Sequence, residues 1–133
     1  MRTKIFDLIS EELKSSDNQK GKVVGKFILV KSDDEISMLF GGINEYPYHA
    51  NLLEQFCSQQ NIPSFWSKKP DELTMQSDIF KLCGGGWVEV NFGEKKFTFF
   101  GESKAYGKFI LSELNYFLTE NGHFKEFETV IKQ

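Results

Sequence analysis

A long apolar run at residues 23–30 constrains the fold more than any other part of this sequence. Valine, phenylalanine, isoleucine and leucine fill the run, and only Gly25 and Lys26 interrupt it. Such a run is typical of a strand that is buried on both faces, because a half-exposed strand would alternate apolar and polar residues. A strand of this kind must be covered on both sides, so we expect helices packed on a sheet.

The pattern of the whole chain predicts an α/β fold, with a mixed β-sheet, helices packed on it and an extra N-terminal helix. In the first half of the chain we expect a helix at residues 3–15, a polar loop to residue 22, strands at 23–30 and 35–40, and a helix that begins at Asn44 or Glu45. An irregular insertion at 61–77, with a short turn of helix at 71–75, follows. The second half is expected to contain strands at 79–83, 87–92 and 95–101, a helix at 105–120 and a strand at 127–131. A chain of 133 residues is long enough for one core, so we expect a single domain over residues 1–133.

Two of the predicted helix starts carry residues that suit an anion. One is Tyr46-Pro47-Tyr48-His49-Ala50, and the other is Ser103-Lys104-Ala105-Tyr106, in which Ser103 is expected to cap the helix. The first-turn amides of a helix lack intrahelical partners and lie at the positive end of its dipole, so they bind phosphate well. If the two starts are neighbours, their amides converge on one oxyanion; ordinary helix capping is the alternative.

His49 is one of two histidines in the chain. Its ordinary pKa suits a general base or a proton shuttle, and the alternative is a histidine that caps the helix or packs in the core. His123 follows Asn121-Gly122, where we expect an exposed turn residue. Because the two histidines have no matching cluster of carboxylates or cysteines, we expect no metal and no cofactor.

Lys26 and the triple glycine at residues 84–86 are the other unusual features. The Lys26 ammonium must reach an edge, solvent or a bound anion, so the side chain either snorkels or contacts the anion. Gly84-Gly85-Gly86 is not followed by the Lys-Ser/Thr pair of a phosphate loop. A β-bulge, or close packing against a helix, explains the glycines more simply.

The charge and composition argue against several classes of partner. A net charge of −3 and a pI near 5.4 disfavour a general nucleic-acid binder. No segment reaches the roughly 18 apolar residues of a membrane span, and the N-terminus does not resemble a targeting signal. Cys57 and Cys83 lack metal-type spacing and lie in apolar patterns, which favours buried reduced thiols and a cytoplasmic protein.

Four segments in register resemble the Janus/Ocnus family, whose best-known members are small phosphohistidine phosphatases. They are Lys26-Phe27-Ile28-Leu29-Val30-Lys31, Tyr48-His49-Ala50, Leu82-Cys83-Gly84-Gly85-Gly86 and Gly101-Glu102-Ser103-Lys104-Ala105-Tyr106-Gly107. The resemblance covers about residues 23–131. It leaves the N-terminal helix and the insertion at 61–77 outside.

The resemblance implies an α/β fold and metal-independent hydrolysis of the P–N bond of phosphohistidine in a protein substrate. By position, His49 corresponds to the general base that activates water, and Lys26 to the side chain that contacts the phosphate. Ser103 and Ala105 correspond to the loop that cradles the phosphate, and the backbone amides of Ala50 and Lys104 would complete the cradle.

Two family arginines are replaced in this chain. The arginine after the triple glycine is Trp87, and the arginine on the strand before the histidine helix falls at Phe40 or Gly41. Lysines at 31, 104 and 108 are possible substitutes, although a lysine lacks the bidentate grip of a guanidinium. The alternative is therefore a non-catalytic member that binds a phosphate-bearing ligand or another protein; in either case a monomer is favoured.

Overall fold

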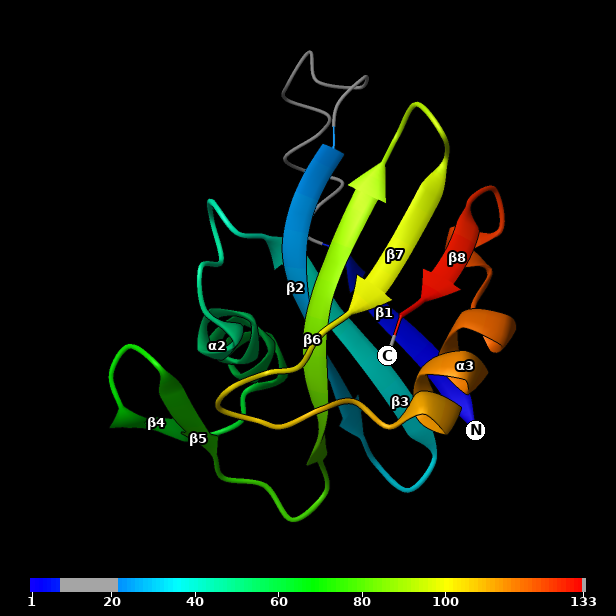
Figure 1. Cartoon of the computed structure of the whole chain (residues 1–133). Helices are drawn as coiled ribbons and strands as arrows, with labels where there is room; N and C mark the ends of the chain where they lie inside the picture. The colour runs from blue at the N-terminus through cyan, green and yellow to red at the C-terminus, as the bar shows by residue number, and fades with distance from the viewer. Residues whose placement is uncertain (8–21, 133) are drawn as a thin grey trace.

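The computed structural model describes residues 1–7 and 22–132, and within them six strands form one mixed sheet (Figure 1). The strands are β1 (Arg2–Asp7), β2 (Lys22–Lys31), β3 (Glu35–Gly42), β6 (Lys81–Asn91), β7 (Lys96–Phe100) and β8 (Glu128–Ile131), in the spatial order β1-β3-β2-β6-β7-β8. The pairs β1–β3 and β7–β8 are parallel, and the other neighbouring pairs are antiparallel. The expected α/β fold with a mixed sheet is confirmed.

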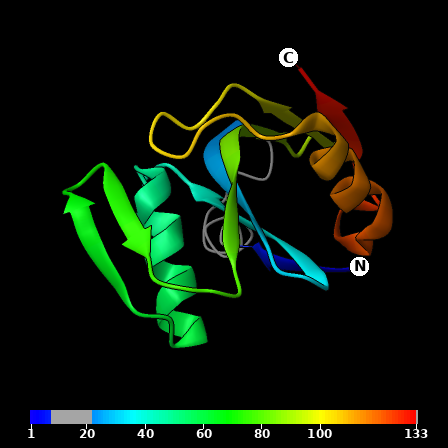
Figure 2. The ribbon, with the colours of Figure 1, turned by 90° about the horizontal axis from the view of Figure 1, so that it is seen from below.

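Helices cover opposite faces of this sheet, as the apolar run in β2 predicts. Figure 2 shows α2 (His49–Gln60) and α3 (Leu111–Glu120) on opposite sides of β6, and a short 3-10 helix, η1 (Gly122–Phe124), follows α3. Phe27 and Leu29 of β2 pack in the core that contains Leu114 of α3, whereas Ile28 and Val30 pack in the core that contains residues of α2. Successive residues of β2 therefore belong to two different cores.

The N-terminal segment is a strand, so the predicted helix is wrong where it can be tested. Residues 2–7 form β1, which pairs in parallel with β3; the rest of the predicted helix, at 8–15, lies outside the described residues. Ile5 packs against the α3-side core and Phe6 against the α2-side core. Neighbouring residues that face opposite ways fit a strand and not a helix.

The predicted irregular insertion at 61–77 contains a β-hairpin. Its strands are β4 (Ser64–Lys68) and β5 (Glu72–Met75), so residues 71–75 form no turn of helix. Leu73 is buried in the α2-side core, and Trp66 and Met75 pack against it. The hairpin therefore lies beside α2, as Figure 1 shows.

Both helices begin later than predicted. α2 begins at His49, because the preceding chain makes a turn in which the Tyr46 amide donates to the Gly42 carbonyl at 2.9 Å. Tyr48 is the N-cap residue of this helix and is 39% exposed, so it does not belong to the apolar face. α3 begins at Leu111 and not near Ala105, and residues 102–109 form a folded loop instead.

The triple glycine lies inside a continuous strand. β6 runs from Lys81 to Asn91, so the predicted break between two strands is wrong, but the register confirms a β-bulge. Ile28 pairs with Gly85 and Val30 pairs with Leu82, so β6 has one extra residue between these pairs. Gly84, at φ +81°, lies in this bulge.

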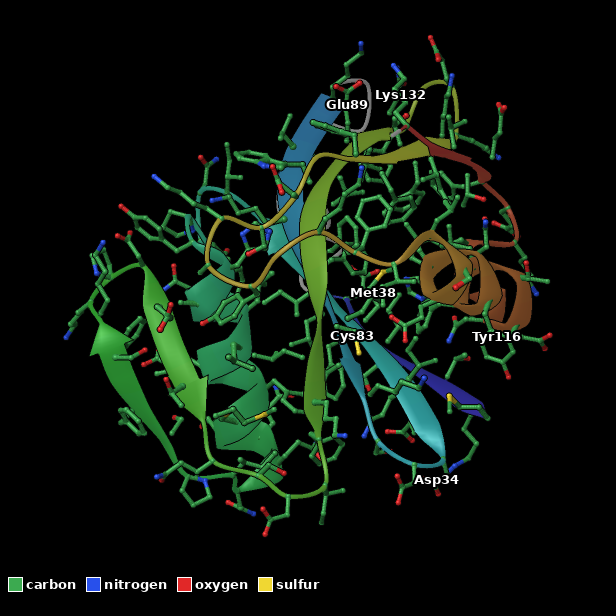
Figure 3. All side chains as sticks on the ribbon, turned by 60° about the horizontal axis from the view of Figure 1, so that its bottom comes forward. Asp34, Met38, Cys83, Glu89, Tyr116 and Lys132 are labelled. Atoms are coloured by element: carbon green, nitrogen blue, oxygen red, sulfur yellow. The ribbon has the colours of Figure 1, made fainter. Side chains whose placement is uncertain are left out.

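The bulge changes which residues of β6 face each helix. Before it, Cys83 lies on the α3 side, where Figure 3 also places Met38. After it, Val88 is buried on that same side. The odd-numbered Trp87 is consequently turned toward the α2 side, next to the start of that helix.

Candidate functional site

A pocket of about 470 Å³ lies where α2 begins, between β2, β6, the β4–β5 hairpin and the loop at 102–109. Four of the predicted site residues line it: Lys26, His49, Lys104 and Ala105. The sequence interpretation missed the other lining residues, which are Tyr48, Lys68, Asp71, Glu72, Trp87 and Glu102. The two segments that were expected to bind an anion therefore do face one pocket.

His49 is held in one orientation at the base of α2. Its side chain is buried, with the residue only 6% exposed, and Nε2 lies 2.8 Å from the Gly86 carbonyl oxygen. A carbonyl oxygen only accepts hydrogen bonds, so Nε2 carries the proton and donates it. In the neutral ring Nδ1 is then the nitrogen with the free lone pair, which is the form a general base needs.

The surroundings of His49 keep it neutral near pH 7. Burial lowers its pKa from 6.5 to about 4, because the charged form loses its hydration. The hydrogen bond to Gly86 raises the pKa in part, and the positive charge of Lys26 lowers it again. The sequence left open whether His49 is a general base or a packed histidine. The side chain is packed, and its Nδ1 can still accept a proton.

Lys26 is fixed against the start of α2. Its Nζ donates to the Pro47 carbonyl oxygen at 2.6 Å and lies 4.7 Å from the centroid of the Trp87 ring. Trp87 of β6 and Gly41 of β3 are the residues paired with Lys26 on either side. Burial lowers the pKa of Lys26 from its ordinary value. The ammonium thus lies in the pocket wall, at hydrogen-bonding distance from the backbone.

The loop at 102–109 takes the place of the predicted helix start. Ser103 and Gly107 exchange backbone hydrogen bonds of 3.1 and 2.8 Å, and the Ser103 hydroxyl accepts from the Tyr106 amide at 3.1 Å. The Gly85 amide donates to the Gly107 carbonyl at 3.0 Å, so the loop pairs with β6 beyond the end of β7. In Figure 1 this segment runs across β6 before it returns to α3.

The Tyr106 side chain joins this loop to the hairpin. Its hydroxyl accepts from the Leu73 amide and donates to the Leu73 carbonyl, both at 2.8 Å. Burial raises the pKa of Tyr106, so the hydroxyl keeps its proton and both bonds persist near pH 7. Two walls of the pocket are thereby held together.

Not every residue predicted for the site lines the pocket. Ala50 and Ser103 are buried, at 0% and 1% exposure, and neither lines the pocket, although each is adjacent in sequence to a residue that does. Lys31, considered as a substitute for a missing arginine, lies 3.4 Å from Glu113 on the α3 side. Arg2, the only arginine in the chain, pairs with Asp34 at 2.9 Å and does not line the pocket. Of the three lysines considered as substitutes for arginine, Lys104 is the one that lines the pocket.

The missed residues come mainly from elements that were predicted wrongly. Lys68, Asp71 and Glu72 belong to the hairpin, whose signal is the alternation of Leu73 and Met75 after a Lys-Pro-Asp turn. Lys68 and Asp71 form an exposed ion pair at 3.9 Å. Their presence gives the pocket carboxylates as well as lysines.

Residues 1–7 and 22–132 contain neither a cluster of metal ligands nor a membrane-spanning α-helix. No group of three or more histidine, cysteine, aspartate or glutamate side chains in residues 1–7 and 22–132 is arranged to hold a metal ion. Neither of the two described α-helices is long and apolar enough to cross a bilayer. Cys57 and Cys83 are free thiols, the first buried and the second half-buried.

Comparison with known proteins places the chain in a family. No curated protein matches the sequence. The Janus/Ocnus family matches residues 14–128, a range that includes every residue lining the pocket. Because this match covers most of the chain, the protein belongs to the Janus/Ocnus family.

Proposed function

We propose that this protein is a phosphohistidine phosphatase, which hydrolyses the P–N bond of a phosphorylated protein without a bound metal. His49 is the general base, and Lys26, with the amides of Lys104 and Ala105, binds the phosphate. The observation that carries the proposal is the hydrogen bond between His49 and the Gly86 carbonyl. Nε2 of His49 is tied to Gly86, which leaves Nδ1 as the basic nitrogen in a pocket that also holds Lys26.

The reaction needs little covalent chemistry from the protein. Water attacks phosphorus while Nδ1 of His49 takes one of its protons, and the P–N bond breaks. The proton that His49 has taken is then passed, directly or through solvent water, to the departing imidazole nitrogen, so that histidine and inorganic phosphate are released and His49 is neutral again. Because a phosphoryl-transfer transition state is loose, positioning of water and stabilisation of the equatorial oxygens provide most of the acceleration.

A pKa of about 4 makes His49 a weak base in the empty pocket. A phosphate dianion bound beside the ring favours the imidazolium and raises the pKa, because opposite charges stabilise each other. The bound substrate therefore brings the base closer to the strength that catalysis at neutral pH requires. Proton transfer is favoured when substrate is present.

A comparison of His49→Ala with the wild-type protein tests this proposal. Phosphate release from a phosphohistidine peptide is measured, and we expect the variant to be slower by at least about a hundredfold, since general-base catalysis contributes that much. His123→Ala is the matched control, because His123 pairs with Asp7 and does not line the pocket. An unchanged rate in His49→Ala would sink the mechanism.

Binding of a phosphorylated ligand without turnover is the second candidate. It is favoured by Trp87, which stands where the family has an arginine, and by Gly41, which has no side chain to offer beside Lys26. In that case, added phosphate changes the NMR chemical shifts of His49 and Ser103, while a phosphohistidine peptide remains intact. Turnover by the wild-type protein would exclude this candidate.

A further inference from the structure

The ammonium of Lys26 lies between two aromatic rings. Nζ is 4.7 Å from the Trp87 ring centroid and 5.6 Å from the Tyr48 ring centroid, both within the range of a cation–π interaction. The hydrogen bond to the Pro47 carbonyl fixes the ammonium from a third side. Lys26 is therefore held before any ligand binds.

Each part of this arrangement has a cause in the fold. Trp87 and Lys26 are directly paired across β6 and β2, and the bulge at Gly84 turns Trp87 to the same face as Lys26. A Cβ on Gly101 would lie 2.9 Å from Cδ1 of Trp87, so the chain packs against the edge of the indole. Tyr48 precedes His49 at the start of α2. The strands and the helix together position both rings.

The other two lysines of the pocket are placed differently. Lys68 has a side chain that is 76% exposed and pairs with Asp71, and Lys104 is exposed at the tip of its loop. A free lysine side chain loses much rotamer entropy when it binds a ligand. Lys26 has already lost that freedom, and with one N–H on Pro47 it keeps two donors for an anion.

We propose that Trp87 and Tyr48 form an aromatic cage that positions the Lys26 ammonium for phosphate. Trp87 is then a positioning residue that acts through Lys26, and it replaces the missing arginine by fixing a lysine instead of binding phosphate itself. The proposal rests on the phosphate site of the proposed function, but it requires only that the pocket binds phosphate. It holds for a catalytic protein and for a binding protein alike.

NMR of the ligand-free protein tests the cage itself. The methylene protons next to Nζ of Lys26 should show an upfield ring-current shift in the wild-type protein. We expect Trp87→Leu to remove most of this shift and Trp87→Phe to retain part of it. If the shift is the same in Trp87→Leu, the indole does not hold Lys26 and the proposal is wrong.

A double-mutant cycle tests what the cage does. We expect Trp87→Leu to raise the KM for a phosphohistidine peptide, or the Kd for inorganic phosphate, about tenfold with little change in kcat, and Trp87→Phe to stay close to wild type. In a Lys26→Met background, Trp87→Leu should have no further effect. In a Lys104→Met background, Trp87→Leu should still raise the KM or the Kd about tenfold. Lys104→Met is therefore the matched control for Lys26→Met.

The outcomes separate this proposal from the proposed function. If the wild-type protein binds phosphate but hydrolyses no phosphohistidine, phosphatase activity is excluded. The double-mutant cycle, measured on the Kd for inorganic phosphate, then still tests the aromatic cage. If Trp87→Leu costs the same factor with and without Lys26, the indole acts directly and the cage is refuted. A protein that neither hydrolyses phosphohistidine nor binds phosphate would overturn both, and thermal unfolding shows whether each variant is folded.

Discussion

The lowered pKa of His49 makes the free energy of unfolding depend on pH. Its pKa is about 4 in the folded protein and 6.5 when unperturbed, so the unfolded chain takes up the proton first as the pH falls. Between these two values the unfolded state binds more protons than the folded state, and the free energy of unfolding therefore decreases with falling pH. Above about pH 6.5 and below about pH 4 this residue contributes no further change.

We expect His49→Gln to lose less stability on acidification than the wild-type protein. Glutamine keeps a donor for the Gly86 carbonyl but does not titrate. From pH 7 to pH 5 the wild-type protein should lose about 2 kcal/mol more of its free energy of unfolding than the variant, measured by urea denaturation. Equal losses would mean that the pKa of His49 is not lowered.

Among the elements, β6 depends most on glycine. A Cβ on Gly85 would lie 2.2 Å from the Phe27 carbonyl oxygen, and a Cβ on Gly84 would lie 2.3 Å from the Lys108 carbonyl oxygen, with φ at +81°. Backbone atoms cannot move aside as a flexible side chain can. The glycines thus let β2 on one side and the loop at 102–109 on the other approach β6 closely.

Alanine at either position should therefore destabilise the protein. We expect Gly84→Ala and Gly85→Ala each to lower the free energy of unfolding by about 2 kcal/mol or more. Gly122→Ala is the matched control, because no atom lies within 4 Å of its added Cβ, and it should stay within about 0.5 kcal/mol of wild type. Thermal unfolding of the three variants measures the difference. Similar midpoints in all three would contradict the close approach at β6.

Elements with a local signal could be predicted from the sequence. The apolar run predicted the buried strand β2. The family resemblance identified Lys26, His49, Lys104 and Ala105, which line the pocket. β1 could not be recognised, because its partner β3 is about thirty residues away and the spacing of its apolar residues also fits a helix. The pairing that decides between strand and helix is not local.

The same reasoning explains the errors around the pocket. Ser103 has the sequence of a helix cap, but the chain after it pairs with Gly85 of β6 and delays α3 to Leu111. Trp87 could be assigned to the pocket only once the bulge was known. A bulge depends on the register between two strands, and the glycines suggested it without fixing which face Trp87 would take.

At the scale of the molecule, the two cores share their strands. Phe27 and Ile28 of β2 are neighbours in the chain, yet each belongs to a different core. The pocket side therefore cannot stay folded if the sheet beneath it loses its α3-side packing. For this reason we propose that the protein unfolds as one cooperative domain.

Phe117→Ala on α3 tests this coupling. Phe117 is fully buried on the α3 side, so we expect a loss of about 3 kcal/mol or more. Fluorescence of Trp66 and Trp87, both on the α2 side, should report the same lowered midpoint as circular dichroism. Ile110→Ala, at a position 53% exposed, is the control. If the tryptophan transition kept its wild-type midpoint while the circular dichroism shifted, the two sides would be separate units.

Because of the bulge at Gly84, the number of residues in β6 also determines which side chains line the pocket. Side chains alternate between the two faces, so the number of residues between Leu82 and Trp87 determines which face every later residue occupies. Removal of one glycine would exchange those faces, turning Trp87 toward the apolar core and Val88 toward the pocket. Single substitutions in this stretch change one side chain, whereas an insertion or deletion of one residue changes the face of every residue after it. We therefore expect related sequences to differ here in residue type and to keep the same length.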